Sequence, residues 1–197
     1  GDSPRRGAGG GGAPAHDAGG GPLKVGLIAV LARANPLDGE RMQQAVQLAV
    51  DEGNANGGLL GGRPVELLVE DDQTLQDMAV TWANKLMSDG VAGVVGPHRS
   101  TNAMAIEAAA KSGGVAFLTG GTTPKITELD NPYLFRARAS DEIFAQVAAT
   151  YAVEKLNATK IGVFYNNDEF GTGAMEVIQQ FCADNGLEFV AEGHNTN

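Results

Sequence analysis

The sequence predicts an α/β protein whose parallel strands form a sheet covered by helices on both faces. From Leu23 onward, short apolar runs of strand length alternate with longer stretches in which apolar residues recur with helical spacing. This alternation is typical of parallel sheets, which need a crossover between successive strands. The chain of 197 residues is 43% hydrophobic, enough to bury the core of a full-sized domain.

The individual elements follow from this alternation. The expected strands are residues 24–31, 64–69, 91–95, 115–118, 133–136, 160–165 and 187–190. The expected helices are residues 38–56, 100–111, 141–156 and 173–185, with one more opened by a capping box at Thr74 to Asp77. The last strand leads into a polar tail without a closing helix, so the predicted sheet looks cut short.

The first 22 residues differ from the rest of the chain. Gly1 to Pro22 contain nine of the 28 glycines, with alanine and proline, and almost nothing to bury. This composition predicts a flexible tether. Two origins stay open for it: an expression remnant or arbitrary starting point, and a spacer between a lipid-anchored N-terminus and a folded domain.

Composition and charge argue against several classes of protein. The only cysteine, Cys182, excludes a disulfide framework and a thiolate zinc cluster, and the three histidines are too scattered to predict a metal site. A net charge of −10 without a basic stripe argues against nucleic-acid binding. No apolar run approaches the roughly 20 residues that cross a bilayer.

The candidate binding residues lie in the turns that follow the expected strands. Ser100 and Thr101 follow the third strand and open a helix, where hydroxyls and free N–H groups suit a carboxylate or phosphate. Gly120, Gly121 and Thr122 follow the fourth strand, where glycines admit a ligand close to the backbone and hydroxyls offer donors and acceptors. Taken alone, the Ser100 turn is more typical of an ordinary N-cap, and the Gly120 turn can equally be a flexible loop. Two on neighbouring strands favour a binding site.

A third polar turn, residues 166–173, follows the strand at 160–165. It places Phe170 between acidic and glycine-rich residues, where the ring can cover the apolar part of a ligand. A solvent-facing helix entry is the alternative interpretation.

An enzyme that uses a nucleotide cofactor is a weaker hypothesis. A dinucleotide-binding fold needs a glycine fingerprint directly after its first strand. Residues 32–36 read Ala-Arg-Ala-Asn-Pro instead. The only feature that fits a dinucleotide-binding fold is the acidic turn at residues 70–72, which follows the second expected strand. No phosphate loop or nucleophile elbow is found either, so neither a cofactor nor a catalytic residue is predicted.

Six segments in order resemble the periplasmic type I solute-binding proteins, the receptors of branched-chain amino acid (Leu/Ile/Val) ABC transporters. They are KVGLIAVL, the long block from GERMQQAVQL to VELLVEDDQT, VAGVVGPHRST, FLTGGTTPKIT, YLFRARASDE and KIGVFYNNDEFGTG. The resemblance covers the chain from Lys24 to about Glu192. It implies two doubly wound parallel-sheet lobes around a ligand cleft, with the second lobe truncated here.

The resemblance also divides the chain and assigns roles. Residues 1–22 would be the tether, 23–138 the N-terminal lobe and 139–197 the start of the C-terminal lobe, with a hinge near residues 136–140. The turn with Ser100 and Thr101 would take the ligand carboxylate. The carbonyl of Gly120 and the hydroxyl of Thr122 would take its ammonium. Phe170 stands where many members have tyrosine.

The implied protein is a non-catalytic periplasmic or extracellular receptor that delivers a solute to an ABC-transporter permease. Its ligand would be a branched-chain or other amino acid, or a small amide. A membrane tether through the N-terminus stays open. The two alternatives are a ligand-sensing domain of the same fold and the nucleotide-dependent enzyme.

Overall fold

The computed structural model describes residues 20–33 and 36–195, which form two parallel sheets, one of five strands and one of two. The predicted α/β class is therefore confirmed. Most of the predicted tether, residues 1–19, lies outside the described residues. Within the described ranges, no helix is long and apolar enough to span a membrane.

The larger sheet has the strand order β2-β1-β3-β4-β5, and every neighbouring pair is parallel. Its strands are β1 (Leu23–Ala29), β2 (Val65–Asp71), β3 (Gly93–Val95), β4 (Ala116–Thr119) and β5 (Leu134–Arg136). Parallel pairing brings the carboxyl ends of all five strands to one edge of the sheet, where ligands bind in folds of this kind.

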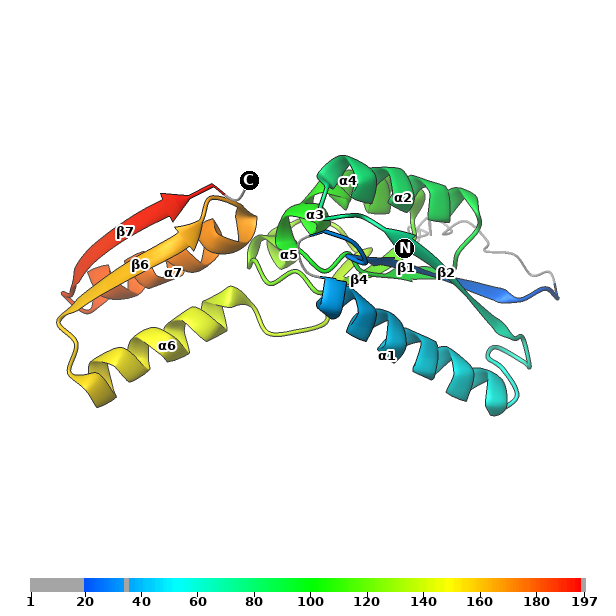
Figure 1. Cartoon of the computed structure of the whole chain (residues 1–197), viewed down its shortest axis with the longest axis horizontal. Coiled ribbons are helices and arrows are strands. Elements are labelled where there is room, and N and C mark those ends of the chain that lie inside the picture. The colour runs from blue at the N-terminus through cyan, green and yellow to red at the C-terminus, as the bar shows by residue number, and fades with distance from the viewer. Residues whose placement is uncertain (1–19, 34–35, 196–197) are drawn as a thin grey trace, which may run out of the picture.

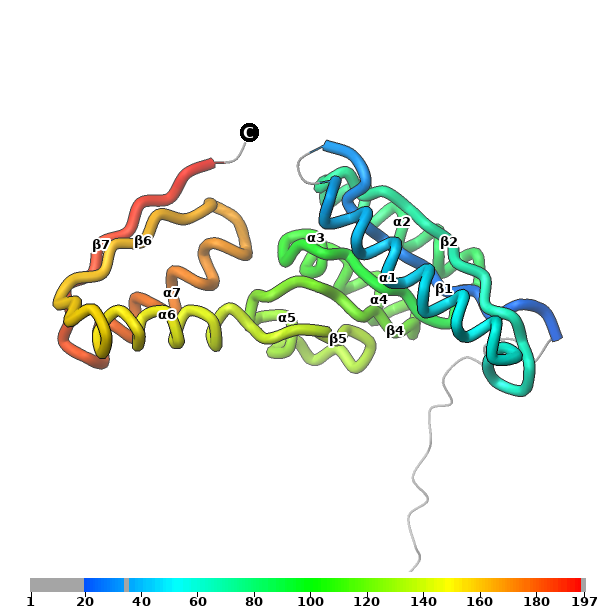
Figure 2. The backbone as a smooth tube through the Cα atoms, turned by 60° about the horizontal axis from the view of Figure 1, so that its bottom comes forward, coloured from blue at the N-terminus to red at the C-terminus, as the bar shows by residue number. Residues whose placement is uncertain are grey.

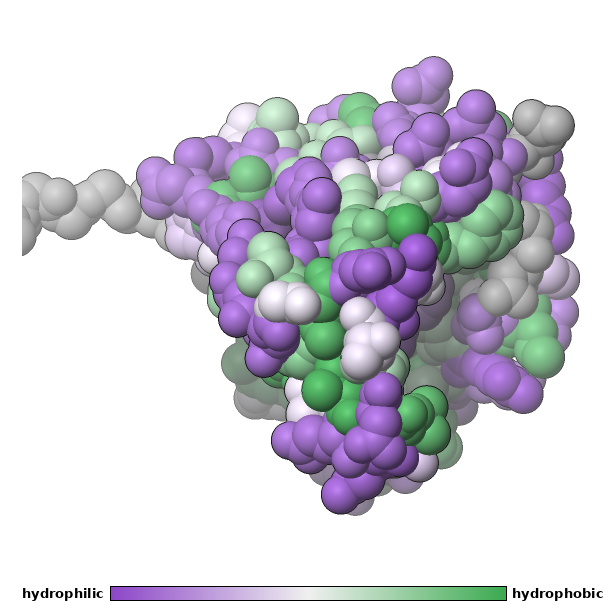
Figure 3. Space-filling model, turned by 90° about the vertical axis from the view of Figure 1, so that its left-hand side faces the viewer, coloured by the Kyte–Doolittle hydropathy of each residue, from purple (hydrophilic) through white to green (hydrophobic). Residues whose placement is uncertain are grey.

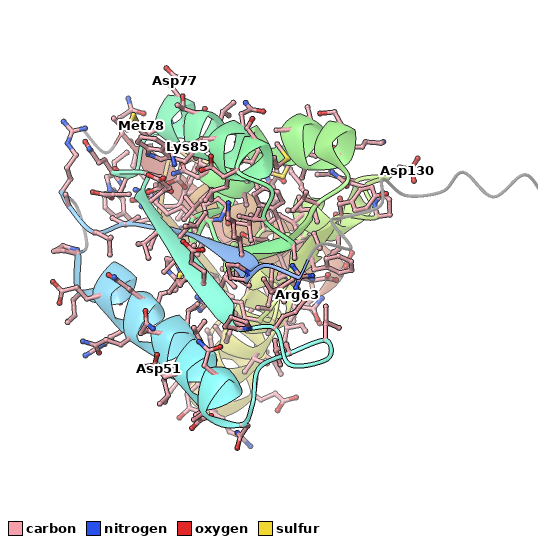
Figure 4. All side chains as sticks on the ribbon, turned by 90° about the vertical axis from the view of Figure 1, so that its right-hand side faces the viewer. Asp51, Arg63, Asp77, Met78, Lys85 and Asp130 are labelled. Atoms are coloured by element: carbon pink, nitrogen blue, oxygen red, sulfur yellow. The ribbon has the colours of Figure 1, made fainter. Side chains whose placement is uncertain are left out.

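Helices cover both faces of this sheet (Figure 1). One face carries α1 (Pro36–Ala55), and the other carries α2 (Gln76–Ser88), α3 (Ser100–Ala105) and α4 (Glu107–Gly113). The main core lies under α2 to α4 and includes Ile28, Leu86, Ile106 and Phe117, all fully buried. Figure 4 looks onto this part of the molecule, with Asp51 on α1 and Asp77 on α2 pointing outward on opposite sides.

A short helix, α5 (Lys125–Glu128), and β5 complete this first lobe, and residues 137–140 lead from it to the second. The second lobe contains α6 (Asp141–Leu156), β6 (Lys160–Asn166), α7 (Glu169–Asp184) and β7 (Glu188–His194). Helix α7 packs on the β6–β7 sheet and on α6. Figure 2 shows the two lobes side by side. In Figure 3, apolar patches interrupt the hydrophilic surface at the second-lobe end.

Several predicted boundaries move for identifiable reasons. Helix α7 begins at Glu169 rather than at residue 173, because Asp168 caps it: its Oδ1 accepts the Gly171 N–H at 2.9 Å. The predicted capping box at Thr74 is wrong. Thr74 has a φ of 65°, in the left-handed region, and Leu75 is the N-cap residue of α2 without a side-chain cap bond.

Candidate functional site

A cavity of about 1210 Å³ lies between the two lobes. Both lobes contribute to its wall: the first through the turns after β1, β3 and β4, and the second through residues after β6 and at the start of α6. Its volume is somewhat larger than the roughly 300–1,000 Å³ typical of small-molecule sites.

Helices α1, α2, α3, α6 and α7 all begin at this cavity. Their first-turn or capping residues line it, namely Asp38, Gln76, Ser100, Asp141 and Asp168. For the helices that follow strands of the larger sheet, this follows from parallel topology, because each of these strands ends at the same edge before the next helix starts. Several helix N-termini directed at one space make its potential more positive, which favours an anionic group.

Five of the six predicted binding residues line the cavity and one does not. The lining residues are Ser100, Thr101, Gly120, Thr122 and Phe170. Gly121 is buried behind the wall, where an added Cβ would lie 2.7 Å from Cδ1 of Ile126. Gly121 therefore permits the turn to pack closely on the lobe, and the predicted close approach of a ligand does not apply to it.

Ser100 connects the two predicted turns through hydrogen bonds. Its Oγ accepts the backbone N–H of Thr122 at 3.0 Å and that of Thr123 at 3.2 Å, and its residue surface is only 2% exposed. Arg99, not Ser100, is the N-cap residue of α3, so the predicted capping role is wrong. With both lone pairs engaged, the Ser100 hydroxyl has its proton left to donate to a ligand.

Asp141, at the start of α6, belongs to the same site and was missed by the sequence analysis. Its backbone N–H donates to the carbonyl of Thr122 at 2.8 Å, and its carboxyl group is hydrogen-bonded to the Thr122 side chain. The residue is 4% exposed, and its Oδ2 is without a hydrogen-bond partner among the described residues. In the sequence, Ser140-Asp141 is indistinguishable from an ordinary helix start, so no local signal marks it.

Burial raises the pKa of the Asp141 carboxyl group. The Thr122 hydrogen bond and the guanidinium groups of Arg138 and Arg136 oppose that rise. An unpaired buried carboxylate oxygen beside a hydroxyl is a suitable acceptor for a cationic group.

Phe170 lies at the rim of the cavity, 46% exposed, at the start of α7. Phe144 of α6 also borders the cavity, with 52% of its surface exposed. The second lobe therefore presents two aromatic rings to a space whose first-lobe lining residues are mostly of polar or charged types.

Two ion pairs link the lobes at the first turn of α7. Arg99 Nη2 lies 3.1 Å from Asp168 Oδ2, and Lys125 Nζ lies 3.2 Å from Glu169 Oε2. In each pair the cation belongs to the first lobe and the carboxylate to the second. Among the described residues, no group of histidine, cysteine and acidic side chains is arranged to hold a metal ion.

Comparison with known proteins defines the family. Residues 22–197 match the family model described as periplasmic binding protein. The chain belongs to this family. Its α/β lobes match the type I members in structure: a leucine-binding protein LivK from Thermotoga maritima superposes with a TM-score of 0.81 at 19% identity, over 89% of this chain and 49% of that one.

Two relatives of this periplasmic binding protein are named for, or were solved with, branched-chain amino acids. The Leu/Ile/Val-binding protein BraC3 of Rhizobium johnstonii is 30% identical over 158 residues, which is 80% of this chain and 43% of the relative. LivJ of Streptococcus pneumoniae, solved in complex with isoleucine, has a TM-score of 0.77 and 28% identity over 89% of this chain and 49% of that one. The chain thus spans about half the length of the relatives it matches.

Proposed function

We propose that this chain forms a ligand-binding cleft of an extracytoplasmic receptor for an ABC importer, and that the cleft binds an amino acid without altering it. One observation carries the proposal: Thr122 is hydrogen-bonded to both Ser100 and Asp141, and all three residues line a single interlobe cavity. Family membership and the printed names of the relatives support the same class of ligand.

The carboxylate end of the ligand would be held by the first lobe. The Ser100 hydroxyl proton is free to donate, and Thr101 follows it in the first turn of α3, where backbone N–H groups have no intrahelical acceptor. Hydrogen bonds to a charged acceptor are about twice as strong as those between neutral groups.

The ammonium end would be held by three acceptors. They are the carbonyl of Gly120, the hydroxyl of Thr122 and the unpaired Oδ2 of Asp141. The Asp141 carboxyl group supplies the negative charge, and its link to Thr122 orients that hydroxyl. A ligand that has both a carboxylate and an ammonium therefore fits this wall better than one that has either group alone.

Closure of the second lobe would complete the site. We assign residues 23–138 and 139–195 to the two lobes and place the pivot in residues 136–140, directly before α6. Binding stabilises the closed state only to the extent that the ligand contacts both lobes. Phe170 would then cover the ligand, and the closed receptor would be the form that the permease binds. Anchoring through the N-terminus is part of this proposal.

Calorimetric titration of the native protein that contains this chain tests the function. We expect α-amino acids to bind, and matched acids without the amino group or amines without the carboxylate to bind far more weakly. Thr122→Val should weaken binding by roughly 1–3 kcal/mol, because a charged donor loses an acceptor. Thr127→Val, on exposed α5, is the control and should bind normally. Absence of binding across all amino acids would refute the proposal.

A further inference from the structure

Helix α7 of the second lobe packs closely against the first lobe at Gly173. A Cβ added at this position would lie 3.1 Å from Oγ1 and 3.8 Å from Cβ of Thr123, and 3.7 Å from Cδ of Pro124. All three atoms belong to the turn after β4, whose earlier residues Gly120 and Thr122 line the main cavity. The first lobe therefore limits the space for a side chain at Gly173.

The nearby Gly171 is needed for a different reason. A Cβ there would overlap the backbone of Asn166, at the end of β6 in the same lobe. Gly171 thus serves the internal packing of the second lobe, whereas Gly173 serves its contact with the first. Gly173 lies within α7 and its φ is outside the left-handed region, so its backbone suits other residues and the first lobe excludes their side chains.

The contact at Gly173 controls the position of Phe170. Phe170 precedes Gly173 by about one helical turn and borders the cavity. Beside it, Asp168 and Glu169 form the ion pairs with the first lobe. Because these residues belong to one helix start, the distance between Gly173 and Thr123 determines how closely Phe170 approaches the opposite wall.

We propose that Gly173 is a positioning residue for closure: its lack of a side chain allows α7 to pack on Thr123 and Pro124 and so brings the lobes together. This inference rests on the proposed function, in which Phe170 covers the ligand in the closed state. A side chain at position 173 would hold the lobes apart, because a packed contact does not absorb added atoms without displacement. The closed state would be less populated, and the apparent dissociation constant would rise.

Gly173→Ala and Gly173→Leu in the native protein test this inference. Alanine and leucine are better helix formers than glycine, so neither should weaken α7 itself. Calorimetric titration uses leucine, or the α-amino acid that the parent binds most tightly. We expect a small loss of affinity for Gly173→Ala and a loss of about tenfold or more for Gly173→Leu. Ala183→Leu, exposed near the end of the same helix, is the control and should bind like the parent.

Thr123→Ala provides a rescue that distinguishes the interlobe contact from a general defect. It removes Oγ1, the atom nearest to the added Cβ, and this hydroxyl oxygen has no hydrogen-bond partner among the described residues. The backbone N–H that Thr123 donates to Ser100 is retained. We expect Thr123→Ala to restore most of the affinity that Gly173→Ala loses. Simple addition of the two effects would overturn the inference.

The distance between the lobes tests closure without a ligand. Spin labels on Asp77→Cys and Asn167→Cys report it, because both positions are exposed and lie on opposite lobes beside residues that line the cavity. Cys182, the only cysteine in the sequence, is buried. Gly173→Leu should lengthen this distance relative to the parent, with and without amino acid.

The outcomes separate this inference from the proposed function. Equal interlobe distances in the parent and Gly173→Leu overturn the inference and leave an amino-acid receptor standing. If no amino acid binds the parent, the proposed function fails, and the ligand-free distances still decide the inference. If Gly173→Leu does not fold, the same measurements on Gly173→Ala decide it.

Discussion

Arg99 and Asp168 form an ion pair of 3.1 Å that joins the two lobes at the wall of the cavity. Asp168 has a second role, since its other carboxylate oxygen accepts the Gly171 N–H and caps α7. The next residue, Glu169, pairs with Lys125 of the first lobe. The first turn of α7 is therefore one of the points at which the second lobe contacts the first, beside the hydrogen bond from Asp141 to Thr122.

A double-mutant cycle on Arg99→Ala and Asp168→Asn should measure this link. We expect a coupling energy of about 0.5–1 kcal/mol in the free energy of ligand binding, because the Arg99 side chain is one-third exposed and solvent weakens the pair. Asparagine keeps an acceptor for the Gly171 N–H, so the cap on α7 is retained. Added salt should reduce the coupling.

The pair between Lys160 and Glu188 provides the matched control. It has a similar separation, 3.2 Å, but both residues lie in the β6–β7 sheet of the second lobe and are more than half exposed. The same cycle on Lys160→Ala and Glu188→Gln should give coupling near zero. A coupling equal to that of Arg99 and Asp168 would show that the interlobe position of the first pair has no effect on binding.

The order of strands and helices could be predicted from apolar periodicity, because each element buries one face. The boundaries of α6, residues 141 to 156, agree with the prediction. The predicted start of a helix was wrong in two places. The cap by Asp168 makes α7 start before the predicted residue 173, and Thr74 cannot cap α2 because its backbone is in the left-handed region. Such features depend on backbone geometry that periodicity does not encode.

The candidate site could be predicted only in part. Ser100 and Thr122 were found because both follow strands whose carboxyl ends share an edge. Asp141 was missed, since its contact with Thr122 joins residues separated by a short helix, a strand and a connecting segment. The interlobe contact of Gly173 was also missed, because nothing in the sequence shows that Thr123 lies against it.

Gly39 should be irreplaceable in α1. A Cβ at this position would overlap the backbone carbonyl of Val30, where the helix start packs against the end of β1. Gly39→Ala should therefore lower the free energy of unfolding by about 1–3 kcal/mol, despite alanine's better helix propensity. Chemical denaturation measures this change.

Gly53→Ala in the same helix is the control. An added Cβ there would meet only the Leu59 side chain at 4.0 Å, so this variant should gain roughly 0.5–1 kcal/mol of stability. Equal effects of the two substitutions would contradict the close approach at Gly39.

The stability of the protein should depend on the ionisation of Asp72. Burial raises the pKa of this carboxyl group above 3.8, and the nearby charge of Asp71 adds to the rise, while bonds from Asn102 and Thr74 and the charge of Arg99 oppose it. The folded state then binds more protons than the unfolded state between the ordinary and the raised pKa. Stability contributed by Asp72 is consequently greatest below that window and falls as pH rises through it.

Asp72→Asn should remove this part of the pH dependence. The unfolding free energies of the variant and the parent should be measured from acidic to neutral pH. As pH rises through the window, the variant should become more stable relative to the parent. Asp51→Asn, on the exposed side of α1, is the control for loss of a surface carboxylate (Figure 4). Parallel curves for parent and Asp72→Asn would contradict the raised pKa.

Ligand binding should depend on pH through Asp141. Burial raises the pKa of its carboxyl group, so the group loses its charge at a higher pH than an ordinary aspartate. Because the ionised form is the better acceptor for an ammonium, the dissociation constant should rise as pH falls through this pKa. Asp141→Asn should weaken binding at neutral pH by about 2 kcal/mol and remove that rise. Asp130→Asn, on an exposed loop, should keep the parent profile, and a pH profile of Asp141→Asn that matched the parent would exclude Asp141 from the ammonium site.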